Sequence, residues 1–198
     1  MPQRLALLTL AFVLGVLPMS ASAADQKPVL DPENTINLDL PAGRVVIQLR
    51  PDLAPNTVAR FKELTRQGFY NGLPFHRVIP GFMAQTGDPL GNGTGGSGKH
   101  LKAEFSKAPH VRGTVSMARA SDPDSADSQF FICFDDASFL NGKYTVFGQV
   151  TSGMEFVDKV KMGTQANNGS VSDPTKIVKM EVAADDKSGK LKVNDKKE

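Results

Sequence analysis

The chain of 198 residues contains a single cysteine, Cys133, so it cannot form an intramolecular disulfide bond. Cys133 lies within an apolar run, and the surrounding sequence offers no setting that would make its thiol a strong nucleophile. We therefore interpret Cys133 as a buried, unreactive side chain.

The sequence also lacks an excess of charge of one sign. Lys and Arg number 23 and Asp and Glu 21, which gives a formal net charge of +2. A dedicated nucleic-acid-binding protein would carry a basic surplus on one face. We expect no nucleic-acid partner.

Long apolar runs are absent except near the start, where Leu5 to Leu17 follow Arg4 and precede the small residues Ala21 to Ala23. This pattern predicts a secretory signal peptide over residues 1–23. This almost unbroken apolar run of 13 residues falls short of the roughly 20 residues that span a bilayer. Removal leaves 175 residues, the size of one domain, with no stable membrane association.

Motifs for metal, nucleophilic or nucleotide chemistry are missing as well. His76, His100 and His110 match no zinc pattern, and no G-x-S-x-G is present. Residues 93–99 have the spacing G-x-x-x-x-G-K, but His100 follows where a phosphate-binding loop needs Ser or Thr. We expect no metal and no other cofactor.

Short alternating and helical patterns fill the rest of the chain. We expect a loose leader at 24–33, one domain at 34–184 and a charged, disordered tail at 185–198. The predicted strands lie within 34–49, 70–85, 113–120, 128–134, 144–150 and 177–182, and the predicted helices within 55–67 and 153–161.

About eight short strands and two helices, without regular strand–helix alternation, indicate a mainly β fold. We predict a closed eight-stranded antiparallel β-barrel, because closure removes the exposed edges of a sheet. The two α-helices would cap its open ends. The sequence contains no internal repeat.

Two stretches combine aromatic and hydrogen-bonding side chains. FHRVIPGFMAQTGD brings Arg77, Phe82, Met83 and Gln85 together, and SQFFICF adds Gln129. A pocket that is mostly apolar with a few placed polar groups suits a ligand with an apolar body and a polar backbone. We expect the functional site here.

Phe130 and Phe131 are neighbours in the second stretch, so in a strand they must point to opposite faces. If Phe130 fills the interior, Phe131 is left on the outer face, where a ligand groove would account for it.

The motifs FHRVIPGFMAQTGD, NGTGG, GTVSMARA, SQFFICF, FLNGKY and VFGQV occur in the order and spacing of the cyclophilins, which the chain resembles from Ile36 to Val182. MARASDPDSADSQFFI is most similar to the periplasmic bacterial members. The resemblance implies isomerisation of X–Pro peptide bonds without a cofactor, in the periplasm. The partners of the protein would be proline-containing polypeptides that are unfolded or partly folded. We expect a monomer by default.

Position by position, the resemblance implies that Arg77 is the catalytic cation. It also implies a set of substrate-binding residues: Phe82, Met83, Gln85, Gly93, Ala118, Arg119, Ala120, Gln129, Phe131, Phe139, Leu140 and Tyr144.

Three positions depart from the family pattern. Arg119 stands where many members have Asn, Tyr144 replaces a His, and Phe139 replaces the Trp of animal forms, which should weaken cyclosporin binding. Two other functions stay open: a peptide-binding chaperone that uses the groove without turnover, and a nonenzymatic structural domain. Arg77 distinguishes an isomerase from the chaperone, because binding alone needs no cation, and the complete set of Arg, Gln and Phe residues argues against a structural domain.

Overall fold

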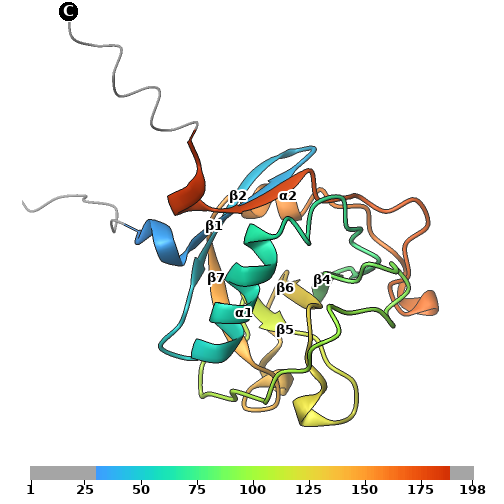
Figure 1. The fold of residues 1–198 in the computed structure, drawn as a ribbon. Coiled ribbons are helices and arrows are strands. Elements are labelled where there is room, and N and C mark those ends of the chain that lie inside the picture. Colours follow the sequence, from blue (N-terminus) through green and yellow to red (C-terminus); the bar gives the residue numbers. More distant parts are fainter. Residues whose placement is uncertain (1–29, 188–198) are drawn as a thin grey trace, which may run out of the picture.

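Eight short strands form one antiparallel sheet in the computed structural model, which describes residues 30–187 (Figure 1). In space the strands follow the order β3-β4-β6-β5-β7-β2-β1-β8. Their bounds are β1 Thr35–Leu40, β2 Gly43–Leu49, β3 Arg77–Ile79, β4 Met83–Thr86, β5 Thr114–Met117, β6 Phe130–Cys133, β7 Val146–Ser152 and β8 Lys179–Val182. The helices are α1 Pro55–Arg66 and α2 Met154–Val157.

The expected signal peptide, 1–23, lies outside the described residues, as does most of the expected tail. Within residues 30–187, no helix is long and apolar enough to cross a membrane.

The prediction of a closed barrel is wrong, because β3 and β8 form the two edges of the sheet and do not pair. An irregular stretch, residues 163–178 and here called the seam segment, lies along β3, and Val78 N donates to Gly169 O at 2.7 Å. Asn168 and Asp173 in this segment have φ angles of 56° and 50°. Such left-handed backbone interrupts the regular pleat of a strand, so the edge of β3 is covered without a continuous ladder.

The predicted first hairpin is confirmed. Leu40 pairs with Gly43 at the turn between β1 and β2. Gly43 has a φ of 147°, and a Cβ there would lie 2.6 Å from ring carbons of Phe156. Only glycine fits between this turn and the ring.

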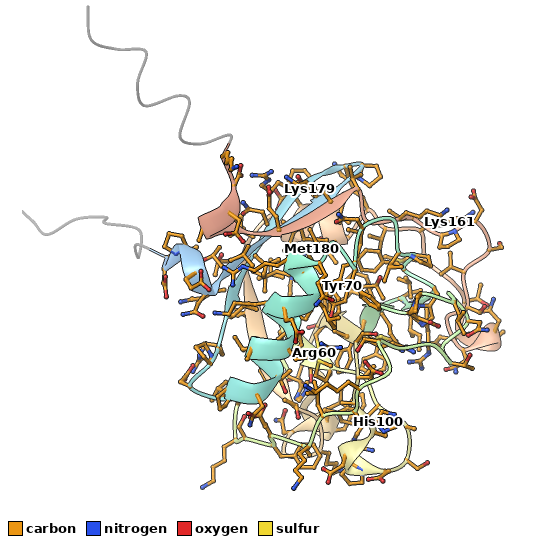
Figure 2. The ribbon with its side chains drawn as sticks, in the orientation of Figure 1. Arg60, Tyr70, His100, Lys161, Lys179 and Met180 are labelled. Atoms are coloured by element: carbon orange, nitrogen blue, oxygen red, sulfur yellow. The ribbon has the colours of Figure 1, made fainter. Side chains whose placement is uncertain are left out.

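Helix α1 covers the interior of the sheet with the face that the sequence predicts. Val58, Phe61 and Leu64 are buried, and the ring of Phe61 lies 4.9 Å from that of Tyr70, which Figure 2 labels beside α1. The helix gives way to Gly68, whose φ of 70° is the usual left-handed stop.

The first turn of α1 is capped by a distant residue. Ala54 at the N-cap offers no side-chain acceptor. Instead the Glu104 carboxylate accepts from Asn56 N at 3.0 Å and from Thr57 N at 2.8 Å. A side chain from the long loop after β4 therefore ties that loop to the helix.

The second helix is shorter than predicted. The spacing of apolar residues suggested a helix over 153–161, but α2 is a single turn that ends at Val157. Val160 is still buried in a following turn, and Lys161 N donates to Thr175 Oγ1 in the seam segment. Burial at every third residue suits consecutive turns as well as a helix.

Buried apolar residues form a main core inside the curved sheet and a smaller group on its outer face. Phe130 belongs to the main core, as strand alternation predicts. The outer cluster consists of Met83, Phe131, Cys133, Ala137 and Leu140. Burial raises the pKa of the Cys133 thiol to about 12, which agrees with an unreactive side chain.

The two ends of the described chain lie side by side, away from the seam segment (Figure 1). Arg66 of α1 joins them, because it contacts Glu33 at 2.8 Å and Asp185 at 2.9 Å. A single arginine side chain of α1 therefore links the two ends of the described chain.

Candidate active site

A groove of about 570 Å³ opens over the outer cluster. Most of the residues predicted for the site line it: Arg77, Phe82, Met83, Gln85, Gly93, Ala118, Arg119, Phe131, Phe139, Leu140 and Tyr144. Ala120 and Gln129 line an adjoining pocket of about 300 Å³ that shares Gln85 and Gly93 with the groove. The structure thus brings the predicted set together.

The floor of the groove is apolar. Met83, Phe131 and Leu140 are buried there. Phe82 and Phe139 have ring centroids 5.3 Å apart, and Phe139 is 61% exposed. The arrangement offers a slot for a compact apolar ring, with one exposed aromatic side chain at its rim.

Arg77, the first residue of β3, extends its half-buried guanidinium along one side of this slot. Nη1 donates to Gln85 Oε1 at 3.1 Å, while Nε and Nη2 donate to Asn168 O and Oδ1 at 3.0 and 2.9 Å. Burial lowers the pKa of Arg77, and nearby Tyr144 opposes that shift. A guanidinium still stays charged at neutral pH and carries five N–H donors, so two have no partner among the described residues.

A chain of amides continues from Arg77. Gln85 Nε2 donates to Gln129 Oε1 at 2.8 Å, and Gln129 Nε2 donates to the carbonyl oxygens of Gly93 and Gly95 at 3.1 and 2.8 Å. Gln129 thus has both N–H groups occupied, whereas Gln85 keeps one for a ligand.

The glycine-rich loop is held by carboxylates and not arranged for a phosphate. Asp88 accepts from the backbone N–H groups of Leu90, Asn92 and Gly93, and Asp127 accepts from three more at residues 97–99. Burial favours a higher pKa for Asp88, but these backbone donors outweigh it and lower the pKa. The N–H groups that would bind phosphate already face negative charge.

Sequence reasoning missed several other residues that line the groove. They are His76, Gly91, Asn92, Asn167, Asn168, Ser170 and Val171. The pair Asn168-Gly169 is a turn signal, and the triplet through Ser170 matches only a glycosylation acceptor. Such a signal shows where the chain bends, whereas the contact with Arg77 arises from tertiary packing.

The three histidines do not form a metal site. His76 is buried beside the groove, His100 is exposed, and His110 is buried with its ring nitrogens 3.1 Å from Asn141 Oδ1 and 3.0 Å from Ser116 Oγ. Among residues 30–187, no group of three His, Cys, Asp or Glu side chains is placed to hold a metal ion.

Comparison with protein families gives a match over residues 35–182 to the model described as cyclophilin type peptidyl-prolyl cis-trans isomerase/CLD. A relative from Brucella suis, named a probable peptidyl-prolyl cis-trans isomerase, is 55% identical over 196 residues, covering 93% of this chain and 98% of its own. Peptidyl-prolyl cis-trans isomerase B of Bacillus subtilis is 49% identical over 122 residues, covering 61% and 85%.

Solved structures give the same fold. Cyclophilin AquaCyp293 from Hirschia baltica aligns with a TM-score of 0.70 and 27% identity, over 79% of this chain and 76% of its own. A Cryptosporidium parvum cyclophilin type isomerase, crystallised in the presence of the dipeptide Ala-Pro, aligns with a TM-score of 0.68 and 29% identity, over 75% and 98%.

Proposed function

Because this chain belongs to the cyclophilin-type peptidyl-prolyl cis-trans isomerases, we propose that Arg77 catalyses the rotation of an X–Pro bond bound in the groove. The observation that carries this mechanism is a charged guanidinium beside an apolar slot, with two N–H groups free of partners among the described residues. Proline has the compact apolar ring that such a slot suits.

Rotation about a peptide bond has a barrier of roughly 18–20 kcal/mol, because the twisted bond loses amide resonance. In the twisted state the proline nitrogen regains a lone pair that can accept a hydrogen bond. Arg77 can donate to this lone pair but not to the planar amide, so the bond favours the transition state. Removing about 7 kcal/mol from the barrier would raise the rate by roughly 10⁵.

The substrate would be held on both sides of the rotating bond. The slot over Met83, Phe131 and Leu140 receives the proline ring. The free N–H of Gln85 and the main chain of residues 118–120 bind the flanking backbone. Holding one side while the other turns requires no nucleophile, acid–base pair or metal.

Exchange spectroscopy on a short Ala-Pro peptide tests the mechanism. The wild type should accelerate cis/trans exchange, and Arg77→Ala should lose most of that acceleration while peptide binding survives in part. An equal loss of binding and exchange would refute the assigned division of roles.

A peptide-binding chaperone is the second candidate. Phe139, exposed at the rim of the groove, would suit capture of apolar segments without turnover. Measurable peptide binding with unchanged exchange in the wild type would favour this function.

We also propose that the enzyme assists the folding of exported proteins in the periplasm. The signal-peptide pattern over residues 1–23 supports this location. Mass spectrometry of the protein from a periplasmic fraction should find Ala24 at its N-terminus. Recovery of full-length protein in the cytoplasm would contradict the proposal.

A further inference from the structure

Arg119 lies where two neighbouring strands of the sheet separate. The last backbone bond between the β5 and β7 segments runs from Met117 N to Thr145 O at 3.0 Å. Beyond this bond the guanidinium of Arg119 connects the two segments. Its Nε and Nη2 donate to Lys143 O at 3.3 and 3.0 Å, and its Nη1 donates to Ala120 O at 2.8 Å. The side chain thus joins two segments that the ladder no longer holds.

The same guanidinium stacks on an aromatic wall of the groove. Its central carbon lies 4.5 Å from the ring centroid of Tyr144 and 5.9 Å from that of Phe105. Tyr144 in turn meets Phe131 edge to face, with centroids 6.1 Å apart and an interplanar angle of 79°. A continuous set of contacts therefore runs from Arg119 through Tyr144 to the floor of the proline slot.

Nearly all the hydrogen-bonding capacity of Arg119 is used inside the protein. Nη1 also donates to Ser121 O at 3.2 Å, so four of the five N–H groups of the guanidinium face main-chain oxygens. This side chain is therefore suited to support the groove and not to bind substrate itself.

We propose that Arg119 is a positioning residue that holds Tyr144 and the main chain of residues 118–121 in their binding geometry. The inference rests on the proposed substrate-binding role of the groove. Since Arg77 and its partners are untouched, the loss of Arg119 should weaken substrate binding more than it slows the bound reaction. Lysine keeps the charge but lacks the planar fork, so it should not restore the function.

The ring of Tyr144 can be observed directly by NMR, because the chain contains only two tyrosines and no tryptophan. Ring carbon–proton NMR spectra of tyrosine-labelled protein would show Tyr144 at the groove and Tyr70, which is fully buried in the main core (Figure 2). In Arg119→Ala and Arg119→Lys, the Tyr144 signal should shift while the Tyr70 signal stays in place.

The kinetic part compares KM and kcat for an Ala-Pro substrate. Arg119→Ala should raise KM about fivefold and change kcat less than about twofold. Arg112→Ala is the matched control, because Arg112 also donates to a main-chain carbonyl, Phe134 O, and does not line the groove. It should leave KM and the Tyr144 signal unchanged.

Three outcomes would overturn the proposal: an unchanged Tyr144 signal in Arg119→Ala, an unchanged KM, or a shift of Tyr70 together with Tyr144, which would mean general loss of structure. If the wild type had no turnover, the function proposed for the groove would fail. The Tyr144 signal and the affinity for the peptide would still decide the role of Arg119.

Discussion

Gln85 Nε2 donates to Gln129 Oε1, and this bond fixes the orientation of both amides. Gln129 Nε2 faces the carbonyl oxygens of Gly93 and Gly95, so its Oε1 must face Gln85, and Gln85 Oε1 must face Arg77. The glycine-rich loop thereby determines which atom is presented to the guanidinium.

Gln129→Glu should disturb this series of hydrogen bonds at the end that is held by the glycine-rich loop. A carboxylate cannot donate to Gly93 O or Gly95 O and is repelled by both. We expect kcat/KM for an Ala-Pro substrate to fall about tenfold, equivalent to about 1.4 kcal/mol of transition-state stabilisation. Gln149→Glu is the control, since it loses a bond to Arg112 O away from the groove. Equal losses in the two variants would contradict the prediction.

Asn168→Gly should separate catalysis from stability. Glycine accepts the φ of 56° but removes Oδ1 from Arg77 Nη2. We expect kcat to fall about fivefold and the free energy of unfolding to change by less than about 1 kcal/mol. Asp173→Gly alters the other non-glycine residue of the seam segment with left-handed backbone, outside the groove, and should leave kcat unchanged. The measurements are peptide exchange and urea denaturation. A kcat of wild-type size in Asn168→Gly would exclude a role for this side chain.

Glu104→Ala should destabilise the fold without affecting the groove. It leaves the N–H groups of Asn56 and Thr57 uncapped, and caps of this kind contribute about 1–2 kcal/mol. Urea denaturation should show that loss, while KM stays at the wild-type value. Glu155→Ala, an exposed acid in α2, should cost much less. Similar stabilities for the two variants would argue against the cap.

Acidification from pH 7 to 5 should weaken the fold through its buried histidines. Burial lowers the pKa of His110, against the bond to Asn141, and lowers that of His76, against the charge of Asp88. Both side chains take up a proton near pH 6.5 when unfolded but only at lower pH when folded. The stability they contribute is thus present above pH 6.5 and is lost below it, by at most about 1.4 kcal/mol per pH unit for each His.

Denaturation curves at several pH values would check this slope. His110→Gln should reduce this slope, because it removes one of the two buried titrating side chains. An unaltered slope in His110→Gln would show that the histidine does not titrate as expected.

Local periodicity allowed the sequence to predict much of the sheet and the floor of the site. Phe130 and Phe131 had to face opposite ways because strand side chains alternate, and the structure confirms that division. The assignment of the polar groups around Arg77 needed the family resemblance, because their spacing along the chain does not show that they meet.

Features that depend on distant contacts could not be predicted. The edge of β3 is covered by the seam segment, which leads into β8 and has left-handed backbone at Asn168 and Asp173. Beyond the early end of α2, Lys161 N bonds to the distant Thr175, and the cap of α1 comes from Glu104, which lies far along the chain. Propensity and alternation carry no information on such pairings.

Because the two ends of the described chain meet at Arg66, the domain has adjacent termini. A short linker from residue 187 back to residue 30 would close the chain into a ring, and new termini could be opened in an exposed loop. The domain could equally be inserted into a host protein through these adjacent ends. In either construction the seam segment, and the groove it borders, would stay on the side away from the junction (Figure 1).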